Sequence, residues 1–256
     1  MPSPRRKIGD PLPSYDWCSI DPLTLGVPHP AGTTPIPELF DPEAAGATLP
    51  FVTAVAEGKS EPLVQVTAHQ VEAAYWQTGW PFTHREAFVR SEVAARLETA
   101  ANLLPDGFGL AVWDAWRDPR LQQLLYETVY VDPTIPPGFV NPPSDDPATP
   151  PPHATGGTVD VTLTWKGKPL ALGTAFDAFV DLARARSLED VTDEGDDALA
   201  RDLRRVLWHA MCATGFVGLA CEWWHFEYGT RLWAAIKNQE PRYPAVTGPA
   251  VLDPST

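Results

Sequence analysis

The chain has 256 residues, 44% of them hydrophobic, and its formal net charge at pH 7 is −14. This length and apolar content suffice for a sizeable core, and the acidic balance excludes nucleic acid and anionic membranes as expected partners. No apolar run reaches the roughly 18 residues of a membrane-spanning helix. Residues 9–13 are polar and proline-rich where a signal peptide would have its apolar segment, so we expect no signal peptide. Three cysteines are too few for a disulfide framework. We expect a cytoplasmic protein, with its oligomeric state left open.

Residues 1–50 are rich in proline and have few periodic apolar positions. We expect them to form an extended arm that wraps the body of the protein or is partly mobile. Residues 51–256 contain no internal repeat and no convincing interdomain linker. They are expected to form one domain of the α+β class.

Two elements are predicted between residues 61 and 107. The alternating side chains of residues 61–69 predict a β-strand. Residues 85–104 predict a helix, because their apolar side chains recur on one face of a 3.6-residue period. That face consists of Val89, Val93, Leu97, Ala100 and Leu104. Glu92 and Arg96 form an outward pair four residues apart, and Pro105, Asp106 and Gly107 end the helix.

Strands and a second helix are predicted in the rest of the chain. Residues 108–116 predict a buried strand, and Arg117 follows where it ends. Residues 132–152 contain nine prolines and are expected to be a loop that leads to His153. Residues 158–165 alternate as a strand with Asp160 on its polar face. Residues 197–216 predict a helix that Gly215 terminates.

Four polar residues lie beside apolar runs, and together they suggest a metal site. His153, Asp160 and His225 form a set of two imidazoles and one carboxylate. Such a set is typical of a catalytic zinc ion that keeps a fourth position for water. Glu222 is a spare carboxylate that could take a proton from this water, and Arg117 could stabilise a developing oxyanion.

Each of these motifs is weak when taken alone. A Glu-x-x-His spacing alone is more often a surface pair or a core histidine whose hydrogen bonds are all made. A lone arginine is most often the partner in a salt bridge. Residues three apart in a straight strand point to opposite faces. We therefore predict a bend or bulge at residues 222–223, or a strand that begins after Glu222. The remaining histidines and two cysteines are expected to be structural: His29, His69, His84, His209, Cys212 and Cys221.

Four ordered motifs resemble the D-alanyl-D-alanine dipeptidases of the VanX type. The resemblance extends from about Val64 to Trp233, and residues 78–82, TGWPF, fit an early family motif. It implies a zinc enzyme with the DD-peptidase/hedgehog-like α+β fold, in which helices flank a central antiparallel sheet. The motifs are LAVWDAWRDPR, HATGGTVDVTL, LGTAFDAF and TGFVGLACEWWHFEY.

The resemblance assigns roles to individual residues. It implies that His153, Asp160 and His225 bind one zinc ion per chain and that Glu222 is the general base and acid. Arg117 would steady the tetrahedral intermediate. Asp177 matches an acidic family position near the amino end of the substrate. Its alternative interpretation is a solvated residue that begins a helix and complements the helix dipole.

Three positions depart from the family pattern. Pro151 replaces a serine that lies two residues before the first histidine ligand, Trp116 replaces a tyrosine before the arginine, and Thr158 replaces an alanine. None of these changes removes an implied ligand or the implied base. They leave the identity of the substrate open.

The activity predicted from these residues is hydrolysis of a short peptide, with D-Ala-D-Ala or a related dipeptide as the expected substrate. One alternative is a D,D-carboxypeptidase that acts on peptidoglycan stem peptides. A second is an Fe(II) oxygenase triad, although its first histidine and carboxylate are usually two residues apart and it has no use for Glu222. A third is a hedgehog-like module that retains zinc without catalysis.

Overall fold

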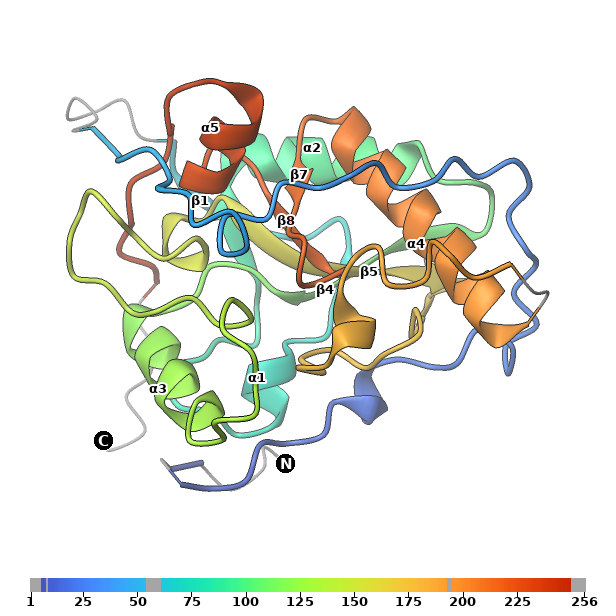
Figure 1. The fold of residues 1–256 in the computed structure, drawn as a ribbon, viewed down its shortest axis with the longest axis horizontal. Coiled ribbons are helices and arrows are strands. Elements are labelled where there is room, and N and C mark those ends of the chain that lie inside the picture. The colour runs from blue at the N-terminus through green and yellow to red at the C-terminus, as the bar shows by residue number, and fades with distance from the viewer. Residues whose placement is uncertain (1–5, 8, 54–60, 193–194, 250–256) are drawn as a thin grey trace.

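A six-stranded mixed sheet lies at the centre of the protein (Figure 1). The computed structural model describes residues 6–7, 9–53, 61–192 and 195–249. Five strands follow the order β2-β4-β5-β8-β7, and β6 pairs with β5. The strands of this sheet are β2 (Gln70–Val71), β4 (Phe108–Asp114), β5 (Thr158–Trp165), β6 (Lys168–Pro169), β7 (Val217–Gly218) and β8 (His225–Glu227).

Strand pairing is antiparallel at the centre of the sheet and parallel at one edge. Strand β5 runs antiparallel to both β4 and β8, whereas β2 runs parallel to β4. The predicted antiparallel sheet is therefore confirmed at the centre and wrong at the β2 edge. A separate two-stranded sheet pairs β1 (Leu63–Gln65) with β3 (Phe88–Arg90).

Helices cover the sheet on two sides. Figure 1 shows α2 above the central strands, α4 running from the top down the right-hand side, and α1 and α3 below the strands. The apolar face of β5, formed by Val159, Val161 and Leu163, is completely buried. The helices are α1 (Ala74–Gln77), α2 (Ser91–Asn102), α3 (Pro119–Val129), α4 (Asp196–Ala213) and α5 (Arg231–Lys237), with short 3-10 turns η1 (Asp16–Cys18), η2 (His153–Thr155) and η3 (Asp181–Ala183).

The predicted helix over residues 85–104 begins later than expected. Residues 88–90 instead form β3, in which Val89 pairs with Val64 of β1. The amide of Arg90 donates to the carbonyl of Gly156, which also holds this stretch extended. Long-range pairing thus overrides the local helical pattern. The strand over residues 61–69 is likewise shorter than predicted, whereas the strands at 108–116 and 158–165 and the second helix are confirmed.

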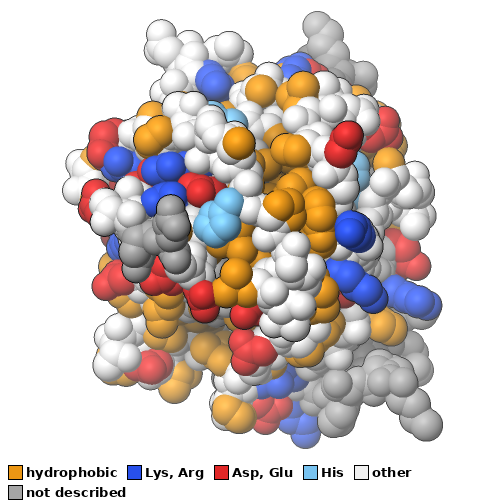
Figure 2. Space-filling view, turned by 90° about the vertical axis from the view of Figure 1, so that its right-hand side faces the viewer, with side chains coloured by type: hydrophobic (Ala, Val, Ile, Leu, Met, Phe, Trp, Pro, Cys, Tyr) orange, Lys and Arg blue, Asp and Glu red, His pale blue; other side chains and the backbone are white. Residues whose placement is uncertain are grey.

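The N-terminal segment passes below α1, beside α4 and back across α5 (Figure 1). Its regular structure in the described part is limited to η1 and a bridge between Ile20 and Leu170. The face at the right of Figure 1 carries a central band of hydrophobic side chains, flanked by interspersed acidic and basic ones (Figure 2). None of the helices in the described residues has the length and apolar content to span a membrane.

Glu92 connects α2 to the end of β8 and to the C-terminal segment. Its carboxylate accepts hydrogen bonds from Arg96, from the Tyr228 hydroxyl at 2.7 Å and from Arg242 at 2.9 Å. Partial burial raises the pKa of Glu92, but these three donors outweigh that effect and lower the pKa to about 2.

We expect Glu92→Gln to be less stable than the wild type at pH 7. Glu92 protonates near its ordinary pKa of 4.5 in the unfolded chain and near 2 in the folded one. Its stabilising contribution is therefore complete above about pH 4.5 and is lost as the pH falls toward 2. Urea unfolding at pH 7, 5 and 3 should show a difference between variant and wild type that shrinks at acid pH. Glu98→Gln, at an exposed position of the same helix, is the control, and a difference independent of pH would contradict the assignment.

Candidate metal centre

The pairing of β5 with its two neighbours places three polar side chains in one row. Asp160 of β5 lies opposite Asp114 of β4 and opposite His225 of β8. Directly opposed residues in antiparallel strands project from the same face of the sheet. Asp160 and His225 are each about 2% exposed, and the side chain of Asp114 is 14% exposed.

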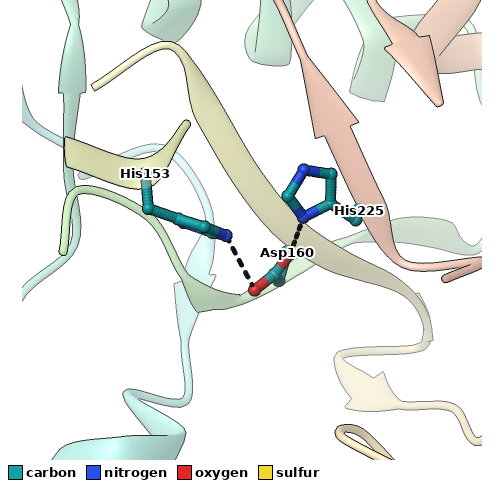
Figure 3. Close-up of side chains that lie close together, drawn as sticks. All are labelled: His153, Asp160 and His225. Carbon is teal, nitrogen blue, oxygen red and sulfur yellow. Dashed lines mark ion pairs between the residues drawn. The ribbon is translucent and has the colours of Figure 1, made fainter. Parts of the chain in front are cut away.

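His153 reaches this row from outside the sheet. It begins η2, directly after the proline-rich loop, and its ring points toward Asp160 (Figure 3). Nε2 of His153 lies 3.4 Å from Oδ2 of Asp160, and Nδ1 of His225 lies 3.1 Å from Oδ1 of the same carboxylate. One ligand atom from each of the three residues falls within 4.8 Å of the other two.

Glu222 lies beside the same group. Strand β8 begins only at His225, and a turn at residues 223–224 separates it from Glu222. This confirms the prediction that the strand begins after Glu222. The turn brings Oε2 of Glu222 to 3.5 Å from Nδ1 of His225, with the Glu222 side chain 7% exposed.

The outer nitrogen of each imidazole has an acceptor of its own. Nδ1 of His153 lies 2.6 Å from the carbonyl of Ala115, and Nε2 of His225 lies 3.0 Å from Oε1 of Glu227. Both acceptors favour a proton on the outer nitrogen, so the inner nitrogen of each ring is the one that would face a metal ion. Histidines that bind metals are typically oriented by such carbonyl or carboxylate partners.

Carboxylates outnumber cations at this site, and burial raises the pKa of two of them. Burial raises the pKa of Asp114 to about 6, with Arg117 opposing the shift and Asp160 adding to it. Burial also raises the pKa of Glu222 well above its ordinary value, against the opposing effect of His225. For His225, burial lowers the pKa, but Asp160 and Glu227 raise it to about 10.

This donor set fits a divalent metal ion. Two imidazole nitrogens and a carboxylate oxygen converge, and Oδ1 of Asp160 is buried without a hydrogen bond of good geometry. A dication would offset the excess of negative charge among these buried carboxylates. Among the described residues, His153, Asp160 and His225 form the group of potential metal ligands whose ligand atoms lie close enough together to share one ion.

Arg117 adjoins the group and is held on several sides. Its guanidinium donates to Asp114 at 2.9 Å, to Gln122 at 2.8 Å and to the Tyr75 hydroxyl at 3.3 Å. Nη2 lies 3.7 Å from Oδ2 of Asp160. Arg117 is therefore a fixed positive charge next to the converging ligand atoms.

Asp177 is connected to the site through Tyr75. The Tyr75 hydroxyl donates to its carboxylate at 2.8 Å and receives a hydrogen bond from Arg117. Burial raises the pKa of Asp177 to about 7, with Arg117 opposing the shift. Asp177 has a φ of +52° and lies in a turn. The alternative of a solvated residue at the start of a helix is therefore wrong, because no helix begins there.

A cavity of about 820 Å³ is lined by residues near the site, but His153, Asp160, His225, Glu222 and Arg117 do not themselves line it. Its lining includes Pro151, Glu227 and Cys221, which are close in sequence to His153, His225 and Glu222. Trp116 does not line it; its indole donates instead to the carbonyl of Val246 at 3.0 Å. The remaining departure, Thr158, is completely buried in β5 opposite Glu227.

Sequence reasoning missed four residues that surround the predicted site. Glu227 could have been found, because it lies two residues after His225 in a strand and therefore projects from the same face. Asp114 could have been suspected from its place at the end of the strand that precedes Arg117. Tyr75 and Gln122 reach Arg117 only through tertiary folding and leave no local pattern.

We expect Glu227→Gln to weaken binding of a divalent ion by about 10- to 100-fold, because loss of a partner that orients a ligating histidine typically has this effect. The glutamine keeps an acceptor near Nε2 of His225 but removes the negative charge. Titration of the metal-free protein with Zn²⁺ or Co²⁺ measures the change. Glu240→Gln, at an exposed position, is the control, and an unchanged affinity in Glu227→Gln would contradict the role of Glu227.

The chain is similar to known dipeptidases. A family profile described as D-ala-D-ala dipeptidase, within the peptidase family M15, matches residues 81–245. A D-alanyl-D-alanine dipeptidase from Synechocystis sp. is 28% identical over 228 aligned residues, which cover 74% of this chain and 91% of the relative. The matched region contains Arg117, the three converging residues and Glu222. The chain therefore belongs to the D-ala-D-ala dipeptidase family of peptidases.

Proposed function

We propose that the protein is a zinc-dependent dipeptidase that hydrolyses D-Ala-D-Ala or a related dipeptide. The observation that carries the proposal is the convergence of Nε2 of His153, the Asp160 carboxylate and Nδ1 of His225, with Glu222 alongside. Family membership supports peptide hydrolysis as the reaction.

The proposed cofactor is one zinc ion per chain, held by His153, Asp160 and His225. Two imidazoles and one carboxylate are a common ligand set for catalytic zinc. When bound, such an ion acts as a Lewis acid that lowers the pKa of water and polarises a carbonyl group.

The remaining steps are assigned to side chains of this protein. Glu222 takes a proton from the attacking water and delivers it to the leaving amine nitrogen. The guanidinium of Arg117 stabilises the negative charge that develops on the scissile carbonyl oxygen. Asp177 holds the free amino group of the substrate.

The cavity of about 820 Å³ supports a second candidate, a D,D-carboxypeptidase that acts on peptidoglycan stem peptides. Its lining includes Pro152 and Cys221, the neighbours of His153 and Glu222 in the chain, so a longer peptide bound at the site would extend into it. Cleavage of D-Ala-D-Ala in preference to a pentapeptide that ends in D-Ala-D-Ala supports the dipeptidase; the reverse preference supports the carboxypeptidase.

The proposed setting is cell-wall metabolism in the cytoplasm, with a small peptide as the binding partner. All three cysteines are unpaired in the described structure, as is common in a reducing compartment. The negative net charge also argues against nucleic acid and anionic membranes as partners.

We expect Glu222→Gln to retain the metal ion and to lose about 10²- to 10⁴-fold in kcat, the usual contribution of a general acid–base residue. Asp160→Asn, which removes a proposed ligand charge, should lose both the metal ion and activity. Metal analysis and D-Ala-D-Ala cleavage are measured on the same preparations. Undiminished turnover in Glu222→Gln would refute the role of Glu222, and full metal content in Asp160→Asn would refute the ligand assignment.

A further inference from the structure

Arg204 of α4 is a buried arginine, 2% exposed, that has no carboxylate partner at ion-pair distance among the described residues. Its guanidinium is satisfied by oxygen atoms from one stretch of chain. The acceptors are the carbonyls of Leu172 at 2.7 Å, Leu182 at 2.9 Å and Arg184 at 3.0 Å, and the hydroxyl of Ser187 at 2.9 Å. Four hydrogen bonds from one planar group therefore hold residues 172–187, which we call the 172–187 segment.

The same segment is bonded to the residues on both sides of Glu222. The guanidinium of Arg204 also lies over the indole of Trp223, 5.5 Å from the ring centroid. Three hydrogen bonds join the segment to these neighbours of Glu222: Trp223 N to Ala183 O at 3.0 Å, Trp223 Nε1 to Thr174 Oγ1 at 2.8 Å and Ala185 N to Ala220 O at 3.1 Å. A shift of the segment would therefore move the backbone next to Glu222.

The segment also carries Asp177 and has little regular structure of its own. In this stretch the described structure contains only η3, a turn of three residues. Gly173 has a φ of +93°, and a Cβ at this position would lie 3.2 Å from Nη2 of Arg204. The glycine thus permits both the turn and the close approach of the guanidinium.

We propose that Arg204 is a positioning residue that sets the places of Glu222 and Asp177 together, acting through Trp223 and the 172–187 segment. The catalytic roles of these two carboxyl groups rest on the function proposed above. An arginine suits this task because its planar fork reaches several acceptors at fixed angles, whereas a lysine offers one compact ammonium group. Arg204→Lys keeps a nitrogen donor and loses the fork.

Arg205, the next residue of the same helix, provides the matched control. Its guanidinium pairs with the carboxylate of Glu189 at 2.5 Å. A lysine at this position can still form an ion pair with Glu189. Arg204→Lys should reduce kcat/KM for D-Ala-D-Ala by about 10- to 100-fold, the range for a small misplacement of reacting groups. Displacement of Glu222 lowers kcat and displacement of Asp177 raises KM, whereas Arg205→Lys should stay within about twofold of the wild type. Metal content should be unchanged in both variants, because neither arginine contacts His153, Asp160 or His225.

Amide hydrogen exchange provides a measurement that does not depend on catalysis. Arg204→Lys should exchange faster within residues 172–187 and 219–224, including the amides of Ala185 and Trp223, while α2 and α3 remain protected as in the wild type. Normal exchange and normal kinetics in folded Arg204→Lys would overturn the proposal, as would equal effects in Arg205→Lys. If the wild type cleaves no dipeptide, the proposed function fails, and the exchange experiment still tests Arg204.

Thr174→Val tests the same link if Arg204→Lys does not fold. It removes the acceptor of the Trp223 indole with little change of volume. Turnover should fall while the zinc content remains at the wild-type level. Turnover equal to that of the wild type would refute a route through Trp223.

Discussion

The register of β5 against β4 and β8 is the constraint on which the rest of the site depends. It places Asp114, Asp160 and His225 in one row across three strands. A slip of one residue would turn Asp160 to the opposite face, where Val159 and Val161 now complete the core. Both faces of β5 are buried, so the packing of its apolar face holds the polar row in place. His153 and Glu222 are then brought to this row by a 3-10 turn and by the turn before β8.

The site concentrates buried negative charge that the fold alone does not neutralise. Asp114, Asp160, Glu222 and Glu227 lie around two imidazoles, with Arg117 as the adjacent cation. Such an arrangement costs stability, because buried charges lose their hydration. The raised pKa values of Asp114 and Glu222 follow from this burial. A bound dication would relieve the imbalance.

The sequence predicted the elements that have strong local periodicity. The strand around Asp160 and the helix that contains Arg204 were found because their apolar side chains recur at strand and helix spacing. The predicted start of α2 is wrong because pairing with β1 holds residues 88–90 in an extended strand. This contact joins residues 25 apart in the chain, and no local pattern reveals it. The parallel edge strand β2 is only two residues long and gave no signal.

In the candidate site, too, residues in local motifs are predicted, whereas roles that depend on tertiary contacts are not. His153, Asp160, Glu222 and His225 were predicted and lie together, since their motifs come at strand ends and turns. Arg204 and Arg205 are adjacent in one helix and look alike in sequence. The structure distinguishes them: Arg204 meets backbone carbonyls in the interior, and Arg205 pairs with a carboxylate. Such roles depend on which segments meet across the fold.

A crystal structure of the protein loaded with Zn²⁺, with anomalous diffraction recorded at the zinc edge, tests the central claim most directly. The account predicts one anomalous peak per chain at about 2.0–2.2 Å from Nε2 of His153, a carboxylate oxygen of Asp160 and Nδ1 of His225. A zinc ion bound elsewhere, or the absence of a peak between these three side chains, would contradict it.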